Sequence, residues 1–393
     1  MKPLPDARLA VFSHKPCWRS GTSPTGFATD GGFPFQMGAL AEVFGETRLL
    51  VPVAASGKTG GETPLAGPGL RVVPLAPPRG RGIWRKLSMV FWVVRNLPVL
   101  IGETIRADAV HAPVPGDVGT IGMLLGFAFG KPLLVRHCGN WVNERTVAER
   151  FWKWFMERFA GGRNVMLATG GGPDPPSARN PNVSWIFSTS LRDEYLHGNR
   201  GRCERTEPSP RLIIVCRQER AKGAGVVIEA LQILAAEIPG IHLDVVGGGS
   251  ALKDLIALAD RAGVAGRVTF HGPVGHRRVL ELLRQAGLFC FPTTSSEGFP
   301  KAVLEAMACG LPVVTTPVSV LPQLLAGGGG ALVDKASPDA VADAIRYCLA
   351  DTERYREMSR QALQTAAGYS LERWRDTIAA LVTKSWKPDV RAI

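Results

Sequence analysis

Residues 288–316 read LFCFPTTSSEGFPKAVLEAMACGLPVVTT. Two apolar runs, Leu288–Pro292 and Val313–Thr315, flank a stretch of helix-forming residues. Pro300 suits the first position of that helix, where no amide donor is needed, and Gly310 suits its end. Apolar strands separated by helices are typical of a parallel sheet that is covered on both faces. The stretch therefore predicts a strand–helix–strand unit of a doubly wound α/β domain.

The same alternation continues through both halves of the chain. In the second half, the runs Leu212–Cys216, His242–Val246 and Val268–His271 are each followed by a helical stretch. The first half repeats the pattern less regularly, with strand-like runs such as Leu9–Ser13 and Leu133–Arg136. We therefore predict an α/β protein with two Rossmann-like doubly wound domains that face each other across a cleft.

A polar segment rich in Gly and Pro separates the two halves and indicates a linker. We expect an N-terminal domain at 1–196, the linker at 197–211 and a second domain at 212–368. Residues 369–393 would form a C-terminal helix able to pack back on the first domain. Open α/β sheets bind ligands at the carboxyl ends of their strands, so the site is expected in the cleft.

The composition is that of a soluble globular protein, with 45% hydrophobic and 20% charged residues in a chain of 393. The seven cysteines are scattered without a C-x-x-C pair, which argues against a zinc site and suits a reducing compartment. The N-terminus lacks the apolar core of a signal peptide, and no uninterrupted run of eighteen apolar residues predicts a spanning helix. We therefore expect a cytoplasmic protein.

The positive charge is concentrated in the first half of the chain. The net charge is +12, and residues 1–200 hold 23 Lys and Arg against 14 Asp and Glu. This bias fits an anionic membrane surface, nucleic acid or an acidic ligand. No nucleic-acid-binding motif or stacking platform accompanies it, so we expect no nucleic-acid partner.

Two segments of this basic half, 79–102 and 149–163, interleave Arg and Lys with large aromatic residues. Such helices are typical of binding at a membrane interface. The alternative is a pair of core helices whose charged side chains reach outward to water. We favour peripheral attachment to the inner face of a membrane, which would suit a lipid-linked acceptor.

Two carboxylates stand eight residues apart in the opening stretch. Glu297 lies in the loop after a strand, and Glu305 lies in the following helix. The amides of Gly298 and Phe299 precede the helix N-terminus, where anions bind readily. Carboxylates accept hydrogen bonds from sugar hydroxyls while amides hold phosphates, so the pattern suits a nucleotide sugar. The alternative is an exposed helix residue together with an acid that favours the helix dipole.

Two cations and a glycine turn follow earlier strands. Arg217 and Lys222 lie in the exit loop of the run LIIVC, where two cations could neutralise a diphosphate. Alternatively, this is simply a solvated basic loop. Gly247 and Gly248 end the run VVGGGS, a signal that also fits a plain turn.

Taken together, these elements resemble the family-4 (group 1) glycosyltransferases, which have the GT-B fold. The resemblance covers about residues 205–385, and EGFPKAVLEAMACGLPVV at 297–314 is similar to the family's paired-glutamate signature. Two positions depart from the pattern. Cys216 stands where the family usually has glycine, and Gln323 stands where it often has glutamate.

The resemblance implies a role for each polar residue. Glu305 would bind the nucleotide ribose, and Glu297 would contact the hydroxyls of the transferred sugar. Arg217 and Lys222 would hold the diphosphate and stabilise the charge that develops on it as it leaves. The amides at Gly298 and Phe299 would assist them. The family usually retains the anomeric configuration without a divalent metal, and no Asp-x-Asp stands in a suitable place.

The N-terminal half resembles the family more faintly. The run DGGFPFQMGALAEVF is similar to the family's glycine loop, in which Gly32 would let the backbone approach a phosphate or the acceptor. His137, rather than His111, is the better candidate to contact the sugar, and Asn140 and Trp141 would shape the acceptor pocket. The alternatives are a plain loop and two structural histidines.

We therefore expect a retaining, metal-independent glycosyltransferase that uses a nucleoside-diphosphate sugar and needs no cofactor. Its hydroxyl acceptor would be a lipid-linked, polysaccharide or glycolipid precursor. Rival interpretations are a nucleotide-sugar epimerase or a phosphorylase on the same architecture. A further rival is a sugar-nucleotide-binding membrane scaffold without turnover. No lysine is marked as a pyridoxal phosphate carrier, as a phosphorylase would require.

Overall fold

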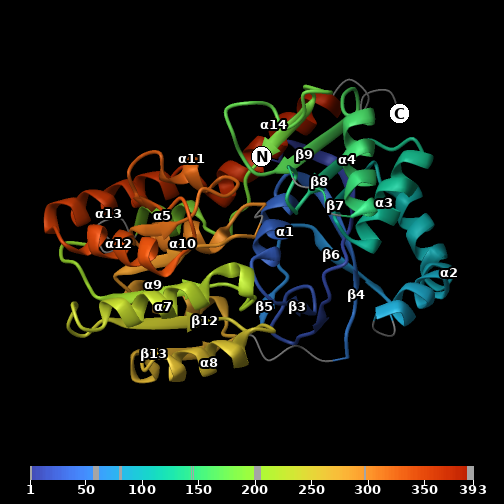
Figure 1. The fold of residues 1–393 in the computed structure, drawn as a ribbon. Coiled ribbons are helices and arrows are strands. Elements are labelled where there is room, and N and C mark those ends of the chain that lie inside the picture. Colours follow the sequence, from blue (N-terminus) through green and yellow to red (C-terminus); the bar gives the residue numbers. More distant parts are fainter. Residues whose placement is uncertain are drawn as a thin grey trace. The chain divides into compact units, whose positions relative to one another are not determined.

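The computed structural model describes residues 2–55, 62–78, 82–142, 144, 146–198, 205–295 and 298–386. The chain forms two compact units (Figure 1). Unit 1 contains Met1–Ser190 and Leu371–Ile393, and unit 2 contains Leu191–Ser370. Both are α/β units built on a parallel sheet, as the alternating pattern predicts. The domain boundaries expected from the sequence and the shared cleft stay predictions.

Unit 1 is built on a seven-stranded parallel sheet in the order β10-β9-β8-β7-β1-β4-β6. Its strands are β1 Leu4–Phe12, β4 Phe44–Pro52, β6 Leu70–Leu75, β7 Ala109–Val114, β8 Leu133–His137, β9 Asn164–Thr169 and β10 Val183–Ile186. A second, antiparallel sheet contains β2 Trp18–Arg19, β3 Phe27–Thr29 and β5 Thr63–Pro64. The sequence pattern did not predict this small sheet, because strands of two or three residues carry no periodicity.

Helices cover both faces of the large sheet. On one face, α1 (Phe33–Ala41) and α14 (Leu371–Trp386) share an apolar core with the strands. On the other face, the core includes side chains of α2 (Gly82–Arg106), α3 (Asp117–Ala128) and α4 (Val147–Phe159). Burial of each apolar stripe against the sheet stabilises the helices more than their propensities do.

Helix α2 has an unusual outer face. Its inner face buries Trp92, Asn96 and Leu100 against the rest of unit 1. The outer face is also apolar, with exposed Val90, Phe91, Val94 and Val99. The segment Ser88–Arg106, with a mean hydropathy of 1.2, is therefore long and apolar enough to cross a membrane by length and composition alone. Because its inner face packs on unit 1, we treat α2 as a surface helix.

Unit 2 is built on a six-stranded parallel sheet in the order β13-β12-β11-β14-β15-β16. Its strands are β11 Arg211–Val215, β12 His242–Val246, β13 Val268–Gly272, β14 Leu288–Phe291, β15 Val313–Thr315 and β16 Gly330–Leu332. Its helices are α5 Asp193–Gly198, α7 Ala224–Leu234, α8 Leu252–Arg261, α9 His276–Gln285, α10 Lys301–Ala308, α11 Leu321–Leu325, α12 Pro338–Leu349 and α13 Thr352–Ala366, with single 3-10 turns at Arg220–Lys222 and Ala265–Arg267. The strand order reverses beside β11 and β14, which are neighbours in space but not in sequence. Ligands of doubly wound sheets bind at such a point.

Candidate active site

The exit loop of β11 carries the first predicted cation. Arg217 follows the strand by two residues, and its side chain is 78% exposed. The guanidinium Nη1 lies 3.1 Å from Oε1 of Glu219 in the same loop. An exposed pair of this kind contributes little to stability. The free-energy cost of moving the Arg217 side chain from Glu219 to a more strongly charged ligand is therefore small.

Lys222 lies further along the same exit loop of β11. There this loop is hydrogen-bonded to the exit loop of β14. The carbonyl of Ala221 accepts hydrogen bonds from the amide of Thr294 at 2.9 Å and from Oγ1 of Thr293 at 3.1 Å. Gly223 follows with φ of +89°, and a Cβ there would lie 2.4 Å from the carbonyl oxygen of Pro292. Only glycine allows this approach. The loop of Lys222 and the loop that leads toward Glu297 are thus held together.

The predicted glycine turn after β12 packs on the Arg217 loop. A Cβ on Gly247 would lie 1.9 Å from the carbonyl oxygen of Cys216, and φ of Gly247 is +117°. Gln218 is buried, and its backbone N–H donates to the carbonyl of Gly248 at 3.1 Å, which stabilises the same turn. Gly248 itself has room for a Cβ, which would touch only Pro273 at 3.5 Å. Gly247 therefore shapes the loop that presents Arg217.

The exit loop of β14 leads into α10 one residue later than predicted. Pro300 is the N-cap residue and α10 begins at Lys301, while Gly310 follows the helix with φ of +69°. The ring of Phe299 packs on that of Tyr369, with centroids 5.5 Å apart. This contact fixes the backbone that carries the Gly298 and Phe299 amides, just before the helix N-terminus. The predicted role of those amides in binding a phosphate stays a prediction.

Glu305 lies on α10 and is paired with a residue that the sequence did not suggest. The side chain is buried, and its Oε1 lies 3.0 Å from Nε2 of His276 at the start of α9. Burial lowers the pKa of His276, but the hydrogen bond and the charge of Glu305 outweigh this and leave it raised. The hydrogen bond from the histidine thereby holds the Glu305 carboxylate in a fixed orientation. The exposed-helix alternative for Glu305 is wrong, because the residue is only 7% exposed.

Unit 2 thus brings several predicted site residues to one edge of its sheet. Arg217 and Lys222 follow β11, Gly247 follows β12, and Glu305 follows β14. Arg217, Lys222 and Gly247 lie in the loops after the carboxyl ends of neighbouring parallel strands, and Glu305 lies in the helix that follows the loop after β14. Glu297 lies outside the described residues. Gln323 lies in α11, the helix that follows β15, and β15 is the neighbour of β14 in the sheet.

The predicted glycine loop of unit 1 opens α1. Gly32 is the N-cap residue, and Gly31 before it adopts φ of +72°. A Cβ on Gly31 would meet no atom within 4 Å, so the backbone conformation and not crowding requires glycine there. Whether Gly32 approaches a phosphate or an acceptor stays a prediction.

Two histidines of unit 1, His111 and His137, are deeply buried. His137 ends β8, and its ring stands edge-on to Trp141 at 5.4 Å between centroids. Burial lowers its pKa to about 4. Burial, aided by the positive charge of Arg136, lowers the pKa of His111 to about 3, and its Nδ1 lies 2.8 Å from the carbonyl of Leu134. Both rings are therefore neutral near pH 7 and could serve a sugar only as hydrogen-bonding groups.

The structure changes the expectation for three aromatic or amide residues. Trp141 is buried and donates from Nε1 to the carbonyl of Pro176 at 2.7 Å, so it packs a loop instead of presenting its ring to an acceptor. Asn140 accepts from the amide of Val142 at 2.8 Å and so helps to form the same loop. Trp92, counted among the interfacial aromatics, is buried as well.

A buried arginine links the points at which the chain leaves and re-enters unit 1, and sequence reasoning did not single it out. Nη2 of Arg136 donates to Oε1 of Gln36 at 3.1 Å, and Nε2 of Gln36 donates to Oγ of Ser188 at 2.9 Å. On the other side, the guanidinium lies 5.2 Å from the ring centroid of Trp374 in α14. Ser188 precedes the exit and Trp374 follows the return.

Within the described ranges, no group of three or more His, Cys, Asp or Glu side chains could hold a metal ion. The polar groups that cluster at the unit 2 site are instead cations, a carboxylate and backbone amides. Such a set can bind a phosphorylated ligand directly.

Three comparisons relate the chain to known proteins. Residues 200–365 match the family model described as "Glycosyl transferases group 1". Over 177 residues the chain is 38% identical to a D-inositol 3-phosphate glycosyltransferase of Mycobacterium tuberculosis strain H37Rv, a match that covers 43% of this chain and 36% of that protein. A D-inositol 3-phosphate glycosyltransferase of Mycobacterium bovis matches equally well. The chain thus spans about a third of the length of these curated relatives.

Solved structures resemble the whole chain in fold. HepE from Anabaena, solved with UDP and glucose, has a TM-score of 0.66 and 17% identity, over 96% of this chain and 100% of its own. Sucrose-phosphate synthase from Thermosynechococcus elongatus has a TM-score of 0.68 and 16% identity, over 98% and 100%. These likenesses show that the fold is the GT-B fold of glycosyltransferases. The similarity to the group 1 glycosyltransferases thus covers residues 200–365, which form most of unit 2.

Proposed function

We propose that this protein transfers a sugar from a nucleoside-diphosphate sugar to a hydroxyl acceptor. The single observation that carries the proposal is the arrangement at the carboxyl edge of the unit 2 sheet. There the loop of Lys222 is hydrogen-bonded to the exit loop of β14, and α10 holds Glu305 paired with His276. One curated relative is named for an inositol phosphate glycosyltransferase activity, and HepE was solved with UDP, which supports a nucleotide-sugar donor.

The chemistry assigns a task to each residue. Glu305 would accept hydrogen bonds from the ribose hydroxyls, and Glu297 would contact the sugar. Arg217 and Lys222 would neutralise the diphosphate as the bond from its oxygen to the anomeric carbon breaks. Donors that are already aimed at the developing charge stabilise the transition state more than the ground state. The transfer would retain the anomeric configuration and would need no divalent metal, because the cations perform the neutralisation.

We further propose that unit 1 binds the acceptor and attaches to the cytoplasmic face of a membrane. The acceptor would be a lipid-linked, polysaccharide or glycolipid precursor. Support comes from exposed apolar side chains on neighbouring helices: Phe91 on α2, Phe127 on α3, and Phe151 and Trp154 on α4. Arg150 and Arg158 lie on α4 among them. A monomeric soluble protein seldom exposes such a set without a partner.

A donor screen tests the proposal. The full chain would be incubated with UDP, GDP and ADP sugars with EDTA present, while thermal stability and nucleotide release are followed. One donor class should raise the melting temperature, since a ligand that binds the folded state stabilises it. Released nucleotide together with a product of unchanged anomeric configuration, observed by NMR, supports retaining transfer. An epimerised free sugar nucleotide would support the epimerase instead, and binding without turnover in any cell extract would support a scaffold.

A further inference from the structure

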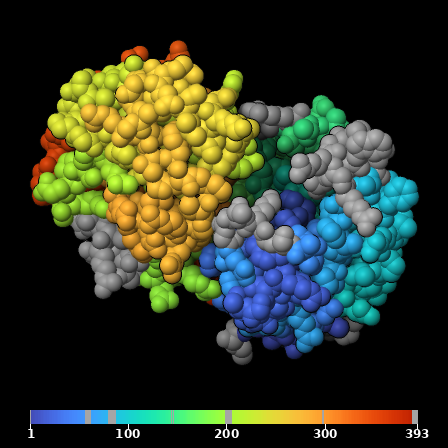
Figure 2. Space-filling model, turned by 90° about the horizontal axis from the view of Figure 1, so that it is seen from below, coloured from blue at the N-terminus to red at the C-terminus, as the bar shows by residue number. Residues whose placement is uncertain are grey.

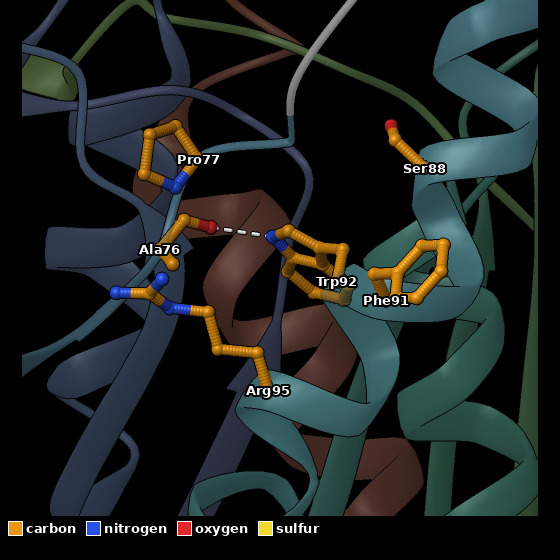
Figure 3. A pocket seen from close by; sticks show the side chains of 6 residues that line it. All are labelled: Ala76, Pro77, Ser88, Phe91, Trp92 and Arg95. Atoms are coloured by element: carbon orange, nitrogen blue, oxygen red, sulfur yellow. Dashed lines mark hydrogen bonds between the residues drawn. The ribbon is translucent and has the colours of Figure 1, made fainter.

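Unit 1 contains a cavity beside α2 that the sugar-transfer site does not use. Its volume is about 360 Å³, near the lower end of the range for small-ligand sites. It lies between the carboxyl end of β6 and one face of α2 (Figure 3). The lining residues are Ala76, Pro77, Ser88, Phe91, Trp92 and Arg95. We call it the α2 pocket.

The wall of the α2 pocket is held in place by hydrogen bonds on both sides of one peptide. The indole Nε1 of Trp92 donates to the carbonyl of Ala76 (Figure 3). Oδ1 of Asn96 accepts from the amide of Ala76 at 3.0 Å, and Nδ2 of Asn96 donates to the carbonyl of Trp92 at 2.8 Å. Asn96 and Trp92 are both buried. These contacts hold the wall formed by Ala76 and Trp92 in place, whereas the lining residues Phe91 and Arg95 are exposed.

Among the lining residues that the structure describes, one is charged, and its charge is positive. Arg95 extends along the wall beside Ala76 and Pro77 (Figure 3). It forms no ion pair with any residue that the structure describes. A guanidinium offers two parallel N–H groups to a phosphate. The described lining residues include no carboxylate, the group that would accept from ribose or sugar hydroxyls, so a nucleotide sugar is a poor fit.

The apolar surroundings identify the rest of the ligand. Phe91 lines the pocket and is also 79% exposed, so the cavity opens at the apolar outer face of α2. Val90 and Val94 on that face are each 66% exposed. In the space-filling view the cyan residues near position 100 form part of the surface of unit 1 (Figure 2). A ligand held by Arg95 would therefore have hydrocarbon-compatible surface directly beside its phosphate.

We propose that the α2 pocket binds the phosphate of an anionic bilayer phospholipid, with its acyl chains lying along Phe91, Val90 and Val94. The inference rests on the proposed attachment of unit 1 to a membrane and adds a specific lipid site to it. Non-specific attraction requires only positive charge spread over a surface. A built pocket requires Arg95 in particular.

Vesicle flotation with the full chain tests the site. Vesicles of phosphatidylcholine alone are compared with vesicles that also contain phosphatidylglycerol. The variants are R95Q, F91S and, as a matched control, R71Q, which removes the same charge from an exposed arginine near the amino end of β6. We expect R95Q to weaken binding to the anionic vesicles on the order of tenfold, F91S to weaken it severalfold, and R71Q to change it little. Equal losses in R95Q and R71Q, or no loss in R95Q, would overturn the site.

Soluble probes separate the lipid from a free anion. Monomeric dihexanoyl phosphatidylglycerol should bind the wild type and not R95Q, as measured by calorimetry, and inorganic phosphate at the same concentration should bind neither. Equal binding of phosphate would overturn the assignment to a lipid. Donor turnover by the wild type in solution reports on the proposed function independently. Its absence would refute sugar transfer, whereas a failure of the vesicle experiment alone would refute only the lipid site.

Discussion

Nε2 of His276 and Oε1 of Glu305 lie 3.0 Å apart and join the first residue of α9 to the middle of α10. The two residues are 29 positions apart in the sequence, and no sequence pattern relates one to the other. Because Glu305 is buried, its carboxylate is oriented by a partner and not by solvent. Several of the following predictions depend on this pair and on the loops around it.

We expect Glu305→Gln to raise the KM for the donor on the order of tenfold to a hundredfold with a smaller effect on kcat. A hydrogen bond to a charged acceptor is worth about 1.5–3 kcal/mol, and the amide would replace one acceptor oxygen by a donor. Steady-state kinetics with the donor found in the screen measure this. Glu281→Gln on α9, whose carboxylate pairs only with exposed arginines of the same helix among the described residues, is the control. An unchanged KM in Glu305→Gln would remove the ribose role.

The His276–Glu305 pair also predicts a pH dependence of stability. The pKa of His276 is raised in the folded state, so its stabilising effect is complete below the unfolded pKa and is lost as the pH rises through the folded one. We expect the melting temperature of the wild type, relative to that of His276→Gln, to fall between pH 6 and pH 8.5. A difference that stays constant over this interval would show that the histidine does not change its charge there.

His111 and His137 predict the opposite trend at acid pH. Their pKa values of about 3 and about 4 mean that the unfolded chain binds more protons than the folded chain below about pH 6.5. Stability should therefore fall as the pH drops from 6.5 toward 4, and less steeply in His137→Asn. Urea unfolding at pH 7 and pH 5 measures this. His197→Gln, on the surface of unit 2, should leave the slope as it is in the wild type.

Arg217→Gln should lower kcat on the order of a hundredfold, because the role proposed for Arg217 is to neutralise the leaving diphosphate. Arg220 is the matched control. It lies in the same loop, is 88% exposed and pairs with Asp254 instead. Arg220→Gln should keep kcat within about twofold of the wild type, since exposed ion pairs contribute little. Similar losses in both variants would mean that the loop acts through its total charge.

Gly247→Ala should destabilise unit 2 by about 2–5 kcal/mol, since the new Cβ would overlap the carbonyl oxygen of Cys216 at a positive φ. Gly266→Ala, where a Cβ would meet nothing within 4 Å, is the control and should change stability by less than about 1 kcal/mol. Urea denaturation of the full chain gives both values. Nearly equal midpoints would contradict the close approach of the turn to the Arg217 loop.

The sequence predicts the parallel sheets well, because apolar runs such as Leu288–Pro292 alternate with long helical stretches. It places the start and end of α10 to within a residue, since Pro300 and Gly310 have strong positional preferences. It does not predict which aromatic side chains are buried. Trp92 and Phe91 are adjacent in the same helix, yet one is buried and the other is exposed. Their burial depends on where α2 lies on the sheet.

Predictions at the site have a similar limit. The residues after each strand could be chosen from sequence, because the carboxyl ends of parallel strands share one edge. The partner of Glu305 could not, because His276 is 29 positions away and reaches it only through the packing of α9. The available signal was His276 itself, because it is the first residue of a helix whose N-cap residue is Gly275. Arg136 was hidden for the same reason, since Gln36 and Trp374 come from opposite ends of the chain.

The return of the chain to unit 1 at Leu371 has a consequence for biosynthesis. The ribosome adds every residue of unit 2 before it makes α14, whose Trp374, Ile378 and Trp386 complete the core beneath α1. Until then, that apolar face and the Arg136 guanidinium are open to water. The core of unit 1 is therefore completed only after all of unit 2 has been synthesised. A nascent chain stalled after Ser370 should attract chaperones through the uncovered face of α1.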